Sequence, residues 1–245
     1  MSDRYLLLRL AGDLLRRPGA ERALDNEGIG TIHREASRLA GAPVAESSSL
    51  ARVRFADRLA EAGLLVRVQR DLYANLAAVP VVHPNEIACR LRDGARVGLH
   101  TVLGELGISH NPSRVVTAII PASSRSIGAP RRQSTPFGDY RFLAMRDDAF
   151  LAGEPEDRED PSSRYPRATP ERAFCDWIYL SSQKGRGNLE GPPLDVDVDG
   201  LDMERLTRLG VAMGVSEQLE RWLERRAEAA QDDESEEKYS RSLGF

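Results

Sequence analysis

Arginine and serine side chains are concentrated between Ser47 and Leu76, and their chemistry suits the recognition of phosphates and bases. A guanidinium group binds phosphate oxygens and can also bond the two acceptors of a guanine in the major groove. Serine hydroxyls at the start of a helix bind phosphate together with the backbone amides there. The candidate residues are Ser47, Ser48, Ser49, Arg52, Arg54, Arg58, Arg67 and Arg70.

A short helix and a hairpin must position these side chains. The serine run is a good helix start, since serine is a preferred N-cap. Arg54 and Arg58 are one turn apart and therefore share a face of the predicted helix, which ends at Gly63. The segments LLVRV and LYANL can then pair as two strands, with Gln69–Asp71 at the tip. A helix followed by such a hairpin is typical of the second half of a winged helix-turn-helix, which places both elements against duplex DNA.

A second interpretation of the same segment is protein contact. In that case the three-helix unit and its hairpin bind another protein, and the arginines are solvated surface residues. Asp57 and Glu61 partly neutralise Arg54 and Arg58 on the predicted helix, so strong non-specific binding to DNA is not expected. Arg52 falls nearer the buried side of that helix than the other two arginines do.

Hydrophobic periodicity predicts an α+β fold of two domains. A winged helix-turn-helix domain is expected at 1–77, a mixed α/β domain at 84–231, and a flexible acidic tail at 232–245. Helices are expected at 5–16, 29–39, 84–91, 98–106, 202–213 and 216–230, and strands at 115–120 and 140–145. Thr169–Glu171 predicts a further helix, because it supplies a capping hydroxyl, a first-turn proline and an acid.

The second domain has a basic segment. Between Asn111 and Arg146 there are six arginines and one acid, Asp139. We expect a basic patch there that either extends the phosphate footprint or contacts an acidic protein surface, with scattered surface charge as the alternative. The candidate residues of this patch are Arg114, Arg125, Arg131 and Arg132.

Metal binding and catalysis have weak support. The stretch Asp195–Gly200 matches the first half of a calcium-binding EF-hand loop, but the twelfth position, which needs a glutamate, is Leu206. The four histidines have no ligand spacing, and the serine runs lack the glycines of a nucleophile elbow. We therefore expect no metal, no cofactor and no enzyme activity. A metal-dependent nuclease or transferase remains a third functional class, motivated by the aspartate cluster.

Composition predicts a cytoplasmic protein. No segment approaches about 18 unbroken apolar residues, so we expect no membrane span. The N-terminus lacks the blocks of a secretory signal, and Cys89 and Cys175 match no metal or redox spacing. The net charge of -4 argues weakly against a nucleic-acid partner, but the distribution of charge matters more than its sum.

Three stretches of the second domain resemble the antitoxins of AbiE-type (type IV) toxin–antitoxin systems. HPNEIACRLRDGARVGLHTVLGELGI is similar to paired helices of that family, and VVTAIIP with YRFLAM is similar to its central strands. YPRATPERAFCDWIYL resembles its most characteristic segment, a strand that leads into a helix opening with ATPE. The similarity covers about Leu50 to Leu223. The first 45 residues depart from the compact N-terminal segment that usually begins the domain in this family.

The resemblance implies a phage-defence antitoxin that represses its own promoter. Its first domain would bind operator DNA. Its second domain would counteract a nucleotidyltransferase-like toxin encoded beside it and add operator contacts. A monomer in solution that assembles on DNA is compatible with this organisation. The alternative is a stand-alone winged-helix regulator whose second domain senses a ligand or dimerises, and the neighbouring gene distinguishes the two.

Overall fold

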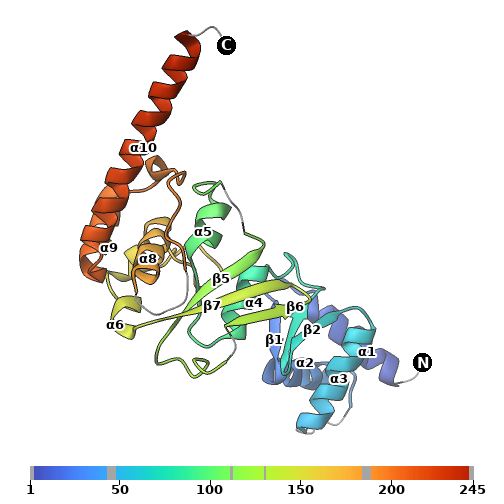
Figure 1. Ribbon diagram of the computed structural model, residues 1–245. Helices are drawn as coiled ribbons and strands as arrows, with labels where there is room; N and C mark the ends of the chain where they lie inside the picture. Colours follow the sequence, from blue (N-terminus) through green and yellow to red (C-terminus); the bar gives the residue numbers. More distant parts are fainter. Residues whose placement is uncertain (1–2, 43–47, 111–112, 130, 184–188, 243–245) are drawn as a thin grey trace. The chain divides into compact units, whose positions relative to one another are not determined.

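The computed structural model divides the chain into two units and has a mixed α+β fold, as predicted (Figure 1). The first unit comprises Met1–Arg92 and Arg132–Tyr140, and the second comprises Asp93–Arg131 and Arg141–Phe245. This division differs from the expected boundary at 77–84. The first unit continues to Arg92, and the chain returns to it at Arg132. The structure describes residues 3–42, 48–110, 113–129, 131–183 and 189–242.

The first unit contains helices around a small antiparallel sheet with strand order β1-β3-β2. Helix α1 packs on α2, and α2 packs on α3. The core between them includes Leu15, Leu24, Ile29, Phe55 and Leu59, each at most 2% exposed. In chain order the elements are α1 (Asp3–Leu15), β1 (Ala23–Asp25), α2 (Asn26–Leu39), α3 (Ser49–Glu61), β2 (Leu65–Gln69), β3 (Leu72–Asn75) and α4 (Pro84–Leu91).

The predicted hairpin is present as β2 and β3. Its tip is Arg70–Asp71, and Asp71 has a φ of 61°, a left-handed conformation that aspartate tolerates better than most residues. The register shifts between Arg67 and Gln69, so the strand carries a bulge just before its tip. The side chain of Asp71 accepts a 2.7 Å hydrogen bond from Nδ2 of Asn26, which ties the tip to the start of α2.

Helix α4 belongs to the first unit, although the sequence placed it in the second domain. It packs on β1 and β3. Its buried side chains include Ile87 and Leu91, and Glu86 forms a 3.2 Å ion pair with Arg22. Hydropathy predicts that α4 exists, but it carries no information about which sheet the helix packs on.

The second unit surrounds a long buried helix, α8. The strands β4, β5, β7 and β6 are hydrogen-bonded in that order, and β6 with the start of β7 is counted in the first unit. The elements are β4 (Arg96–Val97), α5 (Leu99–Glu105), β5 (Val115–Pro121), β6 (Arg132–Thr135), β7 (Gly138–Met145), α6 (Asp147–Phe150), α7 (Pro155–Arg158), α8 (Pro170–Ser182), η1 (Val198–Gly200), α9 (Met203–Met213) and α10 (Ser216–Ser242).

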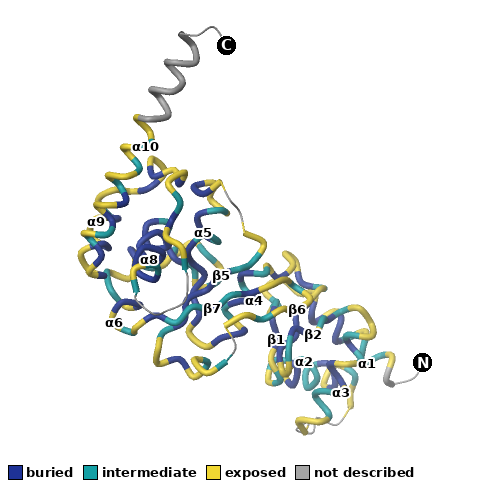
Figure 2. The backbone as a smooth tube through the Cα atoms, viewed as in Figure 1, coloured by how far each residue is buried: buried dark blue, intermediate teal, exposed yellow. Residues whose placement is uncertain are grey.

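Helix α8 starts as the sequence predicts and is buried along its length (Figure 2). Thr169 is its N-cap, with a hydroxyl that accepts a 3.2 Å hydrogen bond from the Arg172 amide. The ring of Phe174 meets that of Trp222 on α10 edge to face, with centroids 4.8 Å apart. Both aromatic residues belong to the core, because neither is more than 1% exposed. Helix α10 continues to Ser242, so the acidic segment predicted as a flexible tail is helical up to that residue.

His100 on α5 is a partly buried histidine with two polar contacts to β5. Its Nε2 lies 3.1 Å from the hydroxyl of Thr117 and 3.4 Å from the carbonyl of Val115. Burial lowers the pKa of His100 below its ordinary 6.5. The hydrogen bond with Val115 raises this pKa, and the charge of Arg141 lowers it further, so the net direction is downward. The unfolded chain therefore binds the proton more readily than the folded chain does.

We expect the stability that neutral His100 contributes to be present above pH 6.5 and to be lost as the pH falls below it. The measurement is urea unfolding at about pH 7.5 and about pH 5.5. The wild type should lose stability between the two, and His100→Asn should lose less. An equal loss in both proteins would show that His100 is not the group responsible.

Candidate nucleic-acid interface

Helix α3 presents Arg54 to solvent. The side chain is exposed, and within the described residues no ion pair or hydrogen bond engages its guanidinium. The helix begins with Ser48 as N-cap, whose hydroxyl accepts a 3.3 Å hydrogen bond from the Ala51 amide. Ser49 is the first helical residue and is exposed, while Ser47 lies outside the described residues. Arg54 is therefore the guanidinium of α3 with the greatest freedom to bind a ligand.

Arg58 is held against its own helix and is only half exposed. Its Nε donates a 3.1 Å hydrogen bond to the carbonyl of Arg54, and its guanidinium carbon lies 5.9 Å from the centre of the Phe55 ring. Arg54 and Arg58 therefore differ in how free their guanidinium groups are to bind a ligand. Arg58 can offer only its terminal amino groups, because its Nε is already used.

Arg52 lies against Gly30 of α2, on the side of α3 nearer the core, as the helical wheel predicts. A Cβ added to Gly30 of α2 would lie 3.1 Å from Nε of Arg52, so the absence of a side chain at Gly30 makes room for this arginine. Arg52 is half-buried as a result. The helical wheel indicated this orientation, but only the structure shows that Gly30 is opposite.

His33 on α2 supports the same region, and sequence reasoning missed this role. Its ring meets the Phe55 ring edge to face at 4.7 Å. Its Nδ1 is buried without a hydrogen-bond partner in the described structure. Desolvation lowers the pKa of His33, and the nearby charge of Arg58 lowers it further, which favours the neutral ring beside α3.

The hairpin supplies two further exposed arginines. Arg67 lies on β2, and within the described residues it forms no ion pair. Arg70 at the tip has its Nε 3.6 Å from a carboxylate oxygen of Asp71, and both groups are exposed, so solvent screens the pair. Arg54 on α3 and Arg67 and Arg70 on the hairpin are therefore exposed arginines on the two elements that the sequence predicts to contact DNA.

Two residues of the predicted basic patch, Arg114 and Arg125, lie beyond opposite ends of β5. Arg132 belongs to the first unit, whereas Arg114, Arg125 and Arg131 belong to the second, and all four are exposed. Arg114 precedes β5 and Arg125 follows it. A strand of 7 residues holds its ends about 20 Å apart. Strand β5 therefore separates Arg114 from Arg125, although both belong to the same arginine-rich segment of the sequence.

The ATPERA stretch forms a buried ionic network. Arg172 donates a 2.7 Å hydrogen bond from Nε to Asp176 and 2.6 Å bonds from its amino groups to the carbonyls of Ala152 and Ala149. Arg96 lies 3.5 Å from the other oxygen of Asp176. The side chains of the two arginines and Asp176 are at most 1% exposed. The most characteristic motif of the sequence is therefore part of the core and cannot contact a ligand.

Glu171 extends this ionic arrangement towards α9. One of its oxygens accepts a 3.0 Å hydrogen bond from the Asp202 amide, and the other lies 3.6 Å from Arg205. Arg205 and Arg208 both contact the buried carboxylate of Asp157, at 3.1 and 3.2 Å. The charges at the start of α8 thus fix the position of α9.

The aspartates resembling an EF-hand act as caps. The Asp202 carboxylate accepts hydrogen bonds of 3.0 and 3.1 Å from the amides of Glu204 and Arg205, which lowers its pKa. Its predicted role as the cap of α9 is confirmed. Asp197 accepts a 3.0 Å bond from the Asp199 amide at η1. Across the described ranges, no cluster of three or more potential metal ligands is found.

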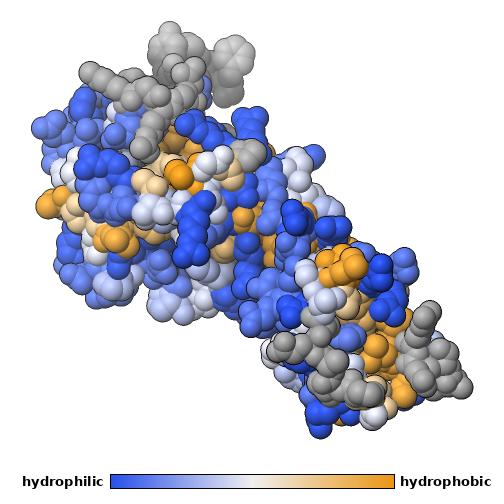
Figure 3. Space-filling view, turned by 90° about the horizontal axis from the view of Figure 1, so that it is seen from below, coloured by the Kyte–Doolittle hydropathy of each residue, from blue (hydrophilic) through white to orange (hydrophobic). Residues whose placement is uncertain are grey.

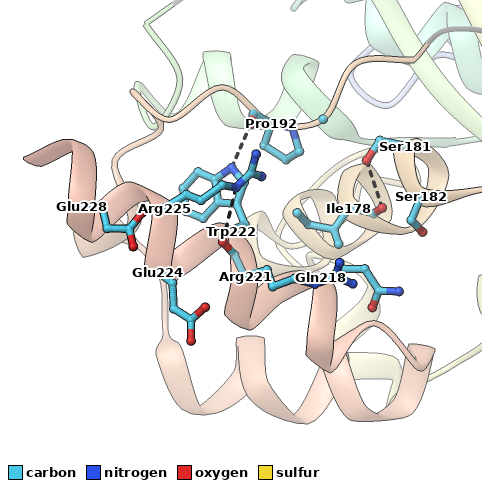
Figure 4. A pocket seen from close by; sticks show the side chains of 11 residues that line it. Ile178, Ser181, Ser182, Pro192, Gln218, Arg221, Trp222, Glu224, Arg225 and Glu228 are labelled. Atoms are coloured by element: carbon cyan, nitrogen blue, oxygen red, sulfur yellow. Dashed lines mark hydrogen bonds between the residues drawn. The ribbon is translucent and has the colours of Figure 1, made fainter.

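A pocket of about 790 Å³ lies between the end of α8 and α10 (Figure 4). Ile178 and Trp222 form part of its wall, and the indole of Trp222 donates a 2.8 Å bond to the Pro192 carbonyl. The hydroxyls of Ser181 and Ser182 donate back to carbonyls of α8. The α10 side of the lining carries charges of both signs, on Arg221, Glu224, Arg225 and Glu228. Among the described lining residues, no nucleophile is paired with a base.

Apolar side chains also reach the surface of the first unit. Figure 3 shows orange apolar groups among the polar surface at its right-hand end, where this unit lies. The exposed large apolar residues of this unit are Tyr5, Leu39, Leu50, Leu76, Val79 and Val81. Surface of this kind can contact proteins. In the part of the chain that the structure describes, no helix combines the length and apolar character needed to cross a membrane.

No family model matches the chain, and no curated protein matches it.

Proposed function

We propose that this protein is a DNA-binding antitoxin whose first unit is a winged helix-turn-helix domain. One observation carries the DNA-binding part: α3 presents an unpartnered guanidinium at Arg54 and is followed by a hairpin with exposed arginines. The element order, with β1 between α1 and α2 and the β2–β3 hairpin after α3, supports the winged-helix assignment. An α-helix fits the major groove of B-DNA, so α3 would be the reading element.

In this mechanism the arginines have different tasks. Arg54 would bond a base edge, because no described residue engages its five donors. Arg67 and Arg70 on the hairpin would contact the phosphate backbone or the minor groove and so set the orientation of α3. Arg58 would reach a phosphate with its terminal amino groups. Binding over the protein's own promoter would exclude RNA polymerase and repress transcription.

The antitoxin part of the proposal rests on the resemblance of three stretches to AbiE-type antitoxins. These stretches form α4, α5, β5, β7 and α8. The second unit would bind and silence a nucleotidyltransferase-like toxin encoded by the adjacent gene, without itself catalysing a reaction.

A stand-alone regulator with a ligand-sensing second unit is the alternative. The pocket between α8 and α10 favours it, since about 790 Å³ is within the usual range of small-molecule sites. The two functions differ in their effect on growth. Only an antitoxin would rescue cells that express the protein encoded next to its gene.

Two assays test the two parts separately. For DNA binding, the full chain is titrated onto a fluorescent duplex that covers the region upstream of its own gene, between about 50 and about 200 mM salt. Binding should be sequence-dependent and should weaken steeply with salt. Absence of binding to the duplex would refute the DNA-binding part. For neutralisation, co-expression with the adjacent gene should restore growth, and continued growth arrest would refute the antitoxin part.

A further inference from the structure

Strand β6 returns to the first unit from a distant part of the sequence. The first unit ends at Arg92 and resumes at Arg132, and the returning segment carries the β6–β7 turn. Nε2 of Gln133 donates a 3.0 Å hydrogen bond to Oε1 of Gln69. Gln69 is the last residue of β2, directly before the hairpin tip. Strand β6 therefore lies beside the part of the hairpin that carries Arg70.

The charge on β6 is unpaired. Arg132 is exposed, and in the described parts of the chain no carboxylate pairs with it. The one acid between residues 111 and 146, Asp139, instead accepts a hydrogen bond from the hydroxyl of Ser134. Arg132 directly precedes Gln133, just as Arg70 directly follows Gln69. The bonded glutamine pair thus brings the backbone of Arg132 to the neighbourhood of the hairpin tip, and its exposed side chain leaves β6 on the face opposite to that of Gln133.

We propose that β6 is part of the DNA-contacting surface, and that Arg132 binds a backbone phosphate next to the site of the hairpin. This inference rests on the proposed DNA binding and deepens it, because it assigns Arg132 to DNA and not to the toxin. The Gln69–Gln133 bond is the positioning contact. It holds β6 beside the hairpin and touches no phosphate itself. The functional DNA-binding unit then requires residues beyond the N-terminal 92.

The first test replaces Arg132 with glutamine in the full chain. The measured quantity is the affinity for the fluorescent upstream duplex as a function of salt. Loss of one phosphate contact should reduce the slope of log K against log salt by about 0.9, and should weaken binding about fivefold at about 0.15 M salt. Arg9→Gln is the matched control, since Arg9 on α1 is also exposed and the substitution removes the same charge. The control should keep the wild-type slope.

The second test breaks the positioning contact without changing charge. Gln69→Ala and Gln133→Ala should each reduce the salt slope, although neither removes a cation. The double variant should bind the duplex no more weakly than the single variant of lower affinity, because either substitution already breaks the bond. Additive losses, or slopes equal to that of the wild type, would show that the glutamine pair does not position Arg132.

The outcomes separate this inference from the function on which it rests. If the full chain binds the duplex and Arg54→Ala weakens that binding, while Arg132→Gln behaves like Arg9→Gln, β6 lies outside the DNA-contacting surface and the inference fails alone. If the full chain does not bind the duplex, both fail. If Arg132→Gln binds DNA normally but no longer co-purifies with the adjacent gene product, the partner of Arg132 is a protein and the inference is overturned.

Discussion

Replacing Arg54 with alanine is expected to weaken binding of the full chain to its upstream duplex by about 5- to 150-fold. This range corresponds to the 1–3 kcal/mol by which a bidentate arginine contact discriminates its base. The physical reason is that Arg54 has no partner within the described protein, so its donors are available to DNA. The dissociation constant, measured by fluorescence anisotropy at a fixed salt concentration, checks this expectation.

Two variants show whether the loss comes from base recognition. Arg54→Lys keeps the charge but cannot form a bidentate contact, so it should retain the salt dependence and lose the preference for the upstream sequence over a scrambled duplex. Arg9→Ala should bind as the wild type does. Because Arg54 is exposed, its replacement should leave thermal unfolding unchanged. Wild-type affinity in Arg54→Ala would exclude α3 as the reading helix.

Replacing Asp176 with asparagine is expected to destabilise the second unit by about 3–5 kcal/mol, the usual cost of breaking a buried ion pair. The substitution leaves Arg172 and Arg96 buried together without their shared carboxylate. Burial already lowers the pKa of Arg96, and Asp176 opposes that shift, which shows that the carboxylate favours the charged guanidinium. Urea unfolding of the full chain measures the effect.

Asp148→Asn is the matched control for this experiment. Asp148 also pairs with an arginine, Arg146, but both side chains are 65% exposed. Solvent-exposed pairs contribute about 0–1 kcal/mol, so the control should unfold almost as the wild type does. If Asp176→Asn were as stable as this control, the buried network could not be what holds α8 in position.

Local signals in the sequence predicted individual elements well. The capping residues Thr169 and Asp202 lie at the starts of α8 and α9, as their side-chain chemistry requires. The strands expected at 115–120 and 140–145 match β5 and β7. Caps and periodicity act within one turn or one strand, so they can be read without knowledge of the remaining chain.

Long-range packing was not predictable in the same way. The bond between Gln69 and Gln133 joins residues 64 positions apart, and no pattern in either segment indicates the other. The extent of the first unit, which runs to Arg92 and resumes at Arg132, depends on long-range packing of this kind. Arg58 shows a related limit: a helical wheel gives the direction of its Cβ, but not the return of its Nε to the Arg54 carbonyl.

The burial of charged residues on α8 differs most from what hydropathy suggests. The apolar residues of this helix share a wide face, which by hydropathy alone would leave the charged residues on a solvent-facing side. In the structure every residue from Glu171 to Leu180 is buried, because Arg96, Arg205 and backbone carbonyls neutralise or bond the charges. Partners this distant in sequence cannot be recognised from one helix alone.

The contact between α3 and DNA can be measured directly by photocrosslinking. A photoreactive amino acid replaces Leu50, which lies in the first turn of α3 and is 59% exposed, and the full chain is irradiated with the upstream duplex. The account predicts a covalent product between protein and DNA. It predicts none when the same group replaces Leu151, which is 60% exposed in the second unit. Equal crosslinking from both positions, or none from position 50 under conditions in which the duplex is bound, would contradict the claim that α3 reads DNA.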